Sequence, residues 1–515
     1  MSVKWKERIQ KCLLWTPAPW LVAAVSVTAA AILLVPLIRL AFYAIPWYDD
    51  YNWGNYIKDF LEQEHSLSSA LQGAAYCVRT EWYAWQGPYT ANFFSAIMPA
   101  VWGEKYYFLG PLFIILFLPA AVWILAGTLM KNVLRTTDKA SCAIVQSVAA
   151  AAAVVLLYSP REGFYWYIGG MCYVGLHSFL MLLVAGWIRL LTVERKISSI
   201  ALLIWTLAGA ALAAGSTYVT ALQGLLIGLS IMTLGLLLRN KRFLLLLPSM
   251  VVYTYGFYIS VSAPGNSVRK AQLEEMGIGM EALPAVSGSF IEAFRQIGEF
   301  TDMALIAMLI LLLPVVWNMV RKIEFPFRYP GLLLLWSFCF YATGFTPCLY
   351  SLGSIGPERA LNVTKLTYQV LLFINVVYWL GWFYRKLEQA QGFPLFGWRW
   401  EKRGKLSANN PPLLFYLAVG MFVFGIVFIN PDRIHSYSSC GAYYAIHSGE
   451  AYNFYQEYLE RVEMIKNSGD DVTVKPYSYA PEMLCVGELT EDMYSGPNRA
   501  IAKWYGKNSV VLDRK

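Results

Sequence analysis

Long apolar runs, separated by short charged or polar segments, set the pattern of the chain. A helix that crosses a bilayer needs roughly 20 predominantly apolar residues, and eleven of the runs approach that length. The pattern therefore predicts an all-α polytopic membrane protein. We place the predicted spans at approximately 18–43, 106–130, 140–158, 168–190, 198–215, 218–238, 243–262, 303–320, 330–347, 364–384 and 412–430.

The composition agrees with this class and argues against a soluble basic protein. The 515 residues are 57% hydrophobic and only 14% charged, whereas soluble domains carry about 25% charged residues. The net charge of +8 is explained by basic loops beside the spans, so no nucleic-acid partner is expected. The eight cysteines and four histidines are scattered without metal-ligand spacing. We therefore predict no certain cofactor and leave a divalent cation open.

Lysine and arginine gather in alternate connecting segments, which predicts how the chain crosses the membrane. Short cytoplasmic loops carry an excess of these residues. The rule places the N-terminus in the cytoplasm and the C-terminus outside. The basic segments contain Lys4, Lys6, Arg8 and Lys11; Lys131, Arg135 and Lys139; Arg189, Arg195 and Lys196; Arg239, Lys241 and Arg242; Arg321, Lys322 and Arg328; and Arg385, Lys386, Arg399, Lys402, Arg403 and Lys405.

The segments on the predicted outer face hold most of the unusual polar residues. The first loop, about 44–105, is amphipathic and rich in aromatic residues, which predicts short helices along the membrane interface. Segment 271–300 has a similar character. We divide the chain into a transmembrane domain, 1–430, and a small extracytoplasmic domain, 431–515.

The small C-terminal domain has a mixed polar sequence that is too short for a rich core of its own. We predict a helix near 450–467 and strand-like pieces at 472–474 and 509–512, packed on the membrane domain. Cys440 and Cys485 both lie in this domain. A disulfide between them is compatible with an oxidising compartment, and the sequence leaves their state open.

Two adjacent acids, Asp49 and Asp50, follow the first predicted span and are flanked by aromatic residues. Carboxylates beside an apolar span are costly to desolvate and are often functional. We predict that one of them is a general base, because neighbouring like charges raise the pKa of one partner. Asp49 is preferred because it is nearer the membrane. The alternative is a solvated loop acid that marks the end of a span.

The second candidate motif is 262–270, which follows the seventh predicted span on the same face. Pro-Gly-Asn favours a sharp turn that would direct Arg269 toward the interface, with Lys270 beside it. A guanidinium group suits bidentate binding of a phosphate, so Arg269 and Lys270 are predicted to bind one, and Asn266 to contact substrate. The alternative is an ordinary turn with a snorkelling cation.

Two further outer segments combine charged and aromatic residues. In the glycine-rich segment 353–360, Arg359 is predicted to bind the same phosphate and Glu358 to orient it or to contact substrate. A local ion pair is the alternative. In segment 161–167, Glu162 and Trp166 suit sugar binding through polar contacts and stacking. An ordinary aromatic belt at the interface is the alternative there.

Taken together, these motifs resemble the GT-C superfamily of glycosyltransferases, polytopic enzymes that use polyprenyl-phosphate-linked sugars. Similar motifs occur in an uncharacterised bacterial family of multi-pass membrane proteins often placed near those enzymes. The quoted motifs cover the chain in order but are short. They are Asp49-Asp50, Ala263-Pro264-Gly265-Asn266 with Arg269, Pro357-Glu358-Arg359-Ala360, and Asn498 to Lys507.

The resemblance implies a GT-C-like fold and an inverting sugar transfer in a bacterial plasma membrane. The implied partners are a polyprenyl-phosphate-linked sugar, a cell-envelope glycan or lipid-linked acceptor, and membrane lipids. Protein N-glycosylation is not expected, because the chain has no matching tryptophan-aspartate signature and its tail is small. The alternatives are a lipid-linked sugar flippase or transporter, and an envelope glycan ligase or polymerase.

Overall fold

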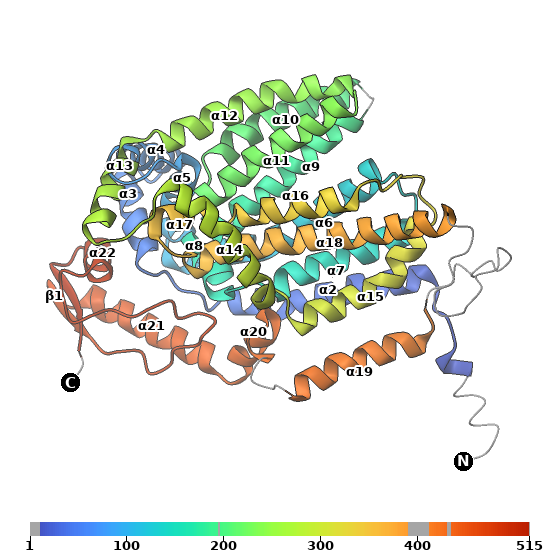
Figure 1. Cartoon of the computed structure of the whole chain (residues 1–515). Helices are drawn as coiled ribbons and strands as arrows, with labels where there is room; N and C mark the ends of the chain where they lie inside the picture. The colour runs from blue at the N-terminus through green and yellow to red at the C-terminus, as the bar shows by residue number, and fades with distance from the viewer. Residues whose placement is uncertain (1–10, 194–195, 390–410, 430–433, 514–515) are drawn as a thin grey trace, which may run out of the picture.

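The computed structural model describes residues 11–193, 196–389, 411–429 and 434–513 (Figure 1). Its described residues form mostly α-helices, many of which lie side by side in a long bundle. Nine helices in these ranges are long and apolar enough to cross a membrane. They coincide with nine of the predicted spans, so the multi-pass helical class is confirmed. The other two predicted spans, near 140–158 and 412–430, correspond to shorter apolar helices.

The bundle is built from helices that follow one another along the chain. Their bounds are α2 (Pro19–Ala41), α6 (Leu109–Thr128), α7 (Lys139–Val155), α9 (Leu176–Thr192), α10 (Lys196–Ala214), α11 (Tyr218–Leu237), α12 (Leu247–Val261), α15 (Met303–Val320), α16 (Pro330–Ala342), α18 (Glu358–Gln389) and α19 (Leu413–Ile429). The alanine-rich α7 packs closely against α2 and α6, because small side chains let helices approach each other within a membrane.

Helices that connect the spans gather toward one end of the bundle, which we call the α3 end (Figure 1). The first loop supplies three of them, as its amphipathic pattern predicts: α3 (Asp49–Gln63), α4 (Leu67–Ala84) and α5 (Tyr89–Ala96). The others are α13 (Pro264–Glu275), α14 (Ala282–Phe300), α17 (Thr346–Leu352) and three short turns, η1 (Pro99–Trp102), η2 (Glu104–Tyr106) and η4 (Arg161–Tyr165). This end therefore holds the segments in which the sequence concentrates its polar motifs.

The structure corrects the predicted turn around Pro264. Pro264 is the first residue of α13 and Arg269 lies within the same helix. Proline is well suited to the first helical position, because the missing N–H has no partner there in any case. The Pro-Gly-Asn sequence therefore begins a helix, and Arg269 reaches its neighbours from that helix.

The C-terminal domain contains the predicted helix and strands. The helix is α21 (Glu450–Asn467), and β1 (Asp471–Val474) pairs in parallel with β2 (Ser509–Leu512). Two helices that the sequence pattern did not predict, α20 (Ser438–His447) and α22 (Gly496–Tyr505), complete the described part. Buried residues of this domain belong to the same hydrophobic cluster as residues of α2, α3 and α6. Both Cys440 and Cys485 are free thiols.

Helix α22 packs directly on α3. Asn55 donates a side-chain hydrogen bond to the carbonyl of Ala500 at 3.2 Å, and Lys58 donates one to the carbonyl of Trp504. Gly54 makes this approach feasible: a Cβ atom there would lie 2.9 Å from the Trp504 ring and 2.7 Å from a Met98 methyl group. The C-terminal domain is thus fixed to the helix that begins with the two acids.

We predict that Gly54→Ala destabilises the protein, because the added methyl group must displace the Trp504 ring or Met98. Overpacking of this kind costs about 1–3 kcal/mol. Gly298→Ala in α14 is the matched control, since a Cβ atom there meets nothing within 4 Å and alanine favours a helix by up to about 1 kcal/mol. Thermal unfolding in detergent measures both changes. Equal midpoints for the two variants would contradict the proposed packing.

Candidate functional site

Asp50 is fully buried and acts as an anchor between three segments. Its Oδ2 accepts hydrogen bonds from the Trp47 backbone N–H at 3.0 Å and from the Tyr107 hydroxyl at 2.7 Å. Its Oδ1 accepts one from the Ile168 N–H at 3.2 Å. Burial raises the pKa of Asp50 to about 7, and these hydrogen bonds oppose the shift. The carboxyl group therefore joins the start of α3 to the segments that precede α6 and α9.

Asp49 has different surroundings, although it is the adjacent residue. It is only partly buried. Burial raises the pKa of its carboxyl group, and the nearby positive charge of Arg359 opposes that rise. A partly buried acid with a raised pKa is better suited to accept a proton than an ordinary surface aspartate. The two acids therefore differ: Asp50 holds segments together through its hydrogen bonds, and Asp49 is a partly buried carboxylate near the positive charge of Arg359.

Arg359 is held at the start of α18 by residues of the segment 161–173. Glu162 accepts a hydrogen bond from the Arg359 backbone N–H at 2.9 Å and lies 3.5 Å from the Arg359 guanidinium. That guanidinium lies over the rings of Trp166 and Tyr173, with 5.1 and 5.8 Å to their centroids. Arg359 therefore contacts both Glu162 and Trp166, which were predicted as site residues from a different motif.

Arg269 approaches the same region from α13. Its Nη1 donates to the side chain of Gln86 at 2.7 Å, and its guanidinium lies over the Trp85 ring at 5.1 Å. Its Nε is buried without a hydrogen-bond partner. Helix α13 and the turn at Gly356, which shortly precedes Arg359, both pack against α17. The two arginines therefore lie in the same part of the α3 end, and the unpartnered N–H of Arg269 leaves a donor for an anion.

The remaining predicted residues have partners within the protein. The Asn266 amide binds the Tyr218 hydroxyl at 2.5 Å and the carbonyls of Ser260 and Val261. Lys270 lies 3.5 Å from Glu274 and beside the Tyr350 hydroxyl. Such partners indicate structural roles at Asn266 and Lys270, while a substrate contact at either stays a prediction.

Glu358 pairs with Arg161 rather than with Arg359. Its Oε2 accepts hydrogen bonds from the Arg161 guanidinium at 3.1 Å and from the Ser159 hydroxyl at 2.7 Å. Arg161 also donates to the carbonyl of Cys485 in the C-terminal domain at 3.3 Å. An ion pair within the loop, the alternative considered for this motif, is therefore replaced by a pair that joins two separate segments and, through Arg161, the C-terminal domain.

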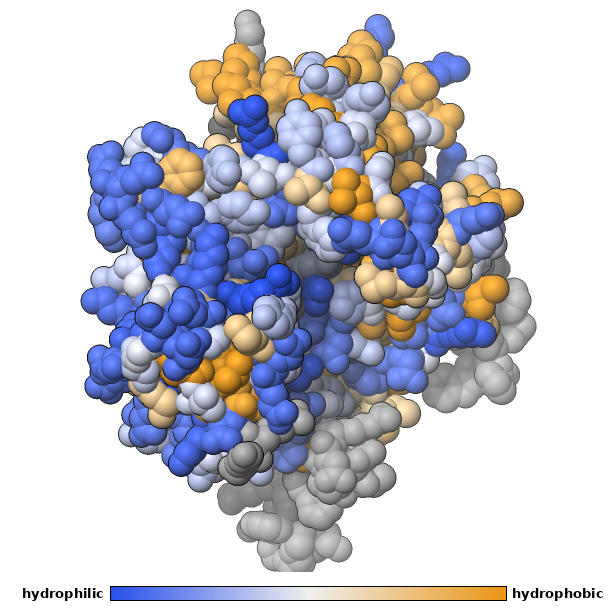
Figure 2. Space-filling model, turned by 90° about the vertical axis from the view of Figure 1, so that its left-hand side faces the viewer, coloured by the Kyte–Doolittle hydropathy of each residue, from blue (hydrophilic) through white to orange (hydrophobic). Residues whose placement is uncertain are grey.

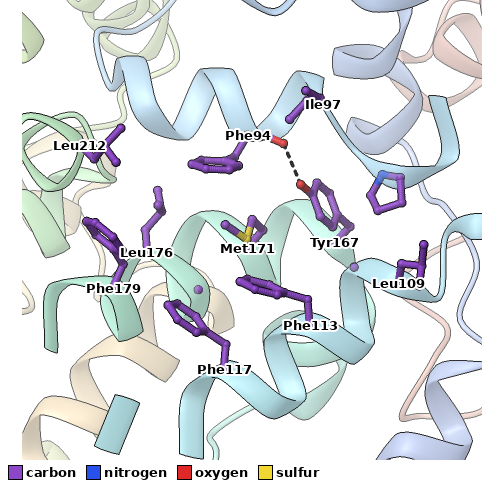
Figure 3. A pocket seen from close by; sticks show the side chains of 13 residues that line it. Phe94, Ile97, Leu109, Phe113, Phe117, Tyr167, Met171, Leu176, Phe179 and Leu212 are labelled. Carbon is purple, nitrogen blue, oxygen red and sulfur yellow. Dashed lines mark hydrogen bonds between the residues drawn. The ribbon is translucent and has the colours of Figure 1, made fainter. Parts of the chain in front are cut away.

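An apolar pocket of about 340 Å³ lies beside this polar site (Figure 3). Figure 3 shows side chains from α5 and α6 facing each other across it, with Met171 between them. Three lining residues, Leu109, Phe113 and Leu212, are 44–48% exposed, so the pocket opens on the apolar sides of the spans. Its lining comprises Phe94, Ile97, Pro99, Leu109, Gly110, Phe113, Phe117, Tyr167, Met171, Gly175, Leu176, Phe179 and Leu212.

The pocket and the acids share one wall. The Tyr167 side chain lines the pocket, while its backbone N–H donates to the Tyr107 hydroxyl at 2.9 Å. The same hydroxyl donates to Asp50, and the next residue, Ile168, binds Asp50 through its own N–H. An apolar chain in the pocket would therefore lie next to the segment that anchors the two acids.

Comparison with protein-family models and with curated proteins gives no match for this chain. Within the described residues, no group of three or more His, Cys, Asp or Glu side chains converges in a way that would hold a metal ion. The function must therefore be inferred from the chemistry of the site residues. Sequence patterns missed the pocket, Trp85, Gln86 and Tyr173, because these ordinary aromatic and polar residues become distinctive only through their neighbours.

We predict that Asp50→Ala lowers the thermal stability far more than Asp49→Ala. The first change leaves two backbone N–H groups and the Tyr107 hydroxyl without their buried acceptor, at about 1–3 kcal/mol for each unsatisfied group. Asp49 lies on the same turn and is the matched control. Unfolding midpoints in detergent give the comparison, and similar losses in the two variants would show that Asp50 is not the anchor.

A second prediction concerns pH. Because the folded pKa of Asp50 is about 7 against an ordinary value of 3.8, the folded state holds this proton over a range where the unfolded state has lost it. The contribution of Asp50 to stability is therefore full below the ordinary pKa and is lost as pH rises through the folded pKa. Asp50→Asn cannot titrate, so its midpoint should decline less between about pH 5 and about pH 8. Parallel profiles for the two proteins would rule out this shift.

Proposed function

We propose that this protein is a membrane glycosyltransferase of GT-C type. In this proposal it moves a sugar from a polyprenyl-phosphate donor to a cell-envelope glycan or a lipid-linked acceptor, at the outer face of a bacterial plasma membrane. The observation that carries the proposal is the presence of three features at the α3 end: the partly buried Asp49, the guanidinium groups of Arg269 and Arg359, and the apolar pocket that shares Tyr167 with the segment binding Asp50.

Each feature supports one part of an inverting transfer. Asp49 accepts the proton of an acceptor hydroxyl. At the same time, the oxygen of that hydroxyl attacks the anomeric carbon of the donor sugar. The bond between that carbon and the phosphate oxygen breaks, and polyprenyl phosphate leaves with the electron pair. Arg269 and Arg359 stabilise the charge that develops on this phosphate, which is the role of preorganised cations in transfer reactions. Configuration at the anomeric carbon inverts, because the attack comes from the opposite face.

The apolar pocket supports a lipid-linked donor. Isoprenoid chains are apolar and branched, and a pocket lined by aromatic and aliphatic side chains that opens on the spans suits them. Glu162 and Trp166 both contact Arg359, and in this proposal they contribute to the binding of the sugar. The proposed orientation puts the α3 end and the C-terminus outside, as the positive-inside rule favours.

The alternative of a transporter receives less support from the residues buried in the spans. Transport of a charged substrate calls for ionisable groups near the midplane that are accessible from a cavity. His177 hydrogen-bonds to Thr367 at 3.3 Å, and Lys365 lies 3.9 Å from Asp302. These groups already have partners in the packing between helices, whereas the buried Nε of Arg269 has no hydrogen-bond partner.

The test is the envelope glycan composition of a deletion strain that carries each variant at matched membrane levels. We expect wild type to restore one missing sugar and Asp49→Asn to fail, because loss of a positioned base costs roughly 10²- to 10⁴-fold in rate. Asp59→Asn is the matched control: Asp59 is exposed on the same helix and the change in charge is identical.

Arg269→Gln is expected to reduce the sugar strongly, since the phosphate then loses one of its two cations. If Asp49→Asn restores the glycan as fully as Asp59→Asn does, the proposed base is wrong. A deletion strain with unchanged glycans would contradict the proposed reaction itself.

A further inference from the structure

The C-terminal domain packs against the two residues that precede the proposed base, Trp47 and Tyr48. A Cβ atom at Gly487 would lie 2.8 Å from the Trp47 ring, and one at Gly496 would lie 2.5 Å from the Tyr48 hydroxyl. Both contacts are made by glycines, whose lack of a side chain lets the domain approach. This contact therefore brings the domain next to the start of α3, where Asp49 lies.

The part of the domain nearest Tyr48 is helix α22, and its position is fixed on both sides. The buried Asn498 side chain makes two hydrogen bonds with the backbone of Thr490, at 3.1 and 2.7 Å. On its other side, the carbonyls of Ala500 and Trp504 accept hydrogen bonds from Asn55 and Lys58 of α3. Residues of α22 are therefore held at a set place relative to the start of α3.

Arg499 is the exposed residue between these fixed points. Tyr48 lies between opposite charges: burial and Asp49 raise the pKa of its phenol, and Arg499 lowers it. Among the residues that the structure describes, no acidic side chain forms an ion pair with Arg499. Lys503, one turn further along α22, is also exposed. Figure 2 shows this end of the molecule, where hydrophilic residues surround a hollow.

We propose that Arg499 binds an anionic group, phosphate or carboxylate, on the glycan acceptor, and so selects negatively charged acceptors for transfer at Asp49. A guanidinium group can bind either anion through two parallel hydrogen bonds. Gly496, one turn before Arg499 in α22, contacts Tyr48, the residue before Asp49, so the anion would bind on the side of the molecule that carries the proposed base. This role rests on the proposed function, because it assigns the acceptor side of the same site.

The test measures binding to the full-length protein in nanodiscs of zwitterionic lipid, which removes anionic headgroups as ligands. Three probes of matched length are a glycerol phosphate oligomer, an oligoglucuronate and a neutral oligoglucan. We expect wild type to prefer one anionic probe, and the choice between them identifies phosphate or carboxylate as the group. Arg499→Gln should weaken that binding roughly tenfold, the loss expected for a charge-assisted hydrogen bond.

Two variants control for general effects. Lys475→Gln makes the same change in charge at another exposed residue of the domain and should bind like wild type. Arg499→Lys keeps the positive charge and should restore part of the affinity. The proposal is overturned if Arg499→Gln binds the anionic probes as wild type does, or if wild type does not distinguish them from the neutral probe.

The outcomes also separate this proposal from the proposed function. Loss of anion binding in Arg499→Gln, together with full glycan restoration by Asp49→Asn, would leave an anion-binding surface and remove the proposed base. Unchanged anion binding in Arg499→Gln, together with glycan loss in Asp49→Asn, would keep the transferase and remove the role of Arg499.

Discussion

The buried carboxyl group of Asp50 is the constraint on which the arrangement of the site depends. A fully buried acid is tolerated because three donors from separate segments point at it: Trp47, Tyr107 and Ile168. These hydrogen bonds fix the first turn of α3 relative to α6 and to the segment before α9. The direction of Asp49, one residue earlier, follows from that attachment.

The anchored turn stands between two different environments. On one side the apolar pocket shares Tyr167 with the wall that holds Asp50. On the other side the C-terminal domain packs on α3 and on Tyr48. In the proposed transfer, the lipid-linked donor would use the pocket and the acceptor would approach along the C-terminal domain. The small C-terminal domain is in this account a part of the site rather than an appendage.

Much of this architecture could be predicted from the sequence, because its signals are local. Apolar runs predicted the spans, and the amphipathic first loop, the helix α21 and the strands β1 and β2 followed from short patterns. The pairing of Arg359 with Glu162 and of Arg161 with Glu358 could not be predicted, since both contacts join segments almost 200 residues apart. The different roles of Asp49 and Asp50 could not be predicted either, because the burial of each side chain depends on tertiary contacts.

In the proposed function, the two arginines, Asp49 and the apolar pocket form one site for a polyprenyl-phosphate donor. The most direct measurement is a cryo-EM map of the protein in nanodiscs with added polyprenyl phosphate. The account predicts density for the phosphate between Arg269 and Arg359, continuous with a chain that enters the pocket lined by Phe113 and Tyr167. A phosphate bound elsewhere, or a pocket that stays empty while the lipid binds at another surface, would contradict it.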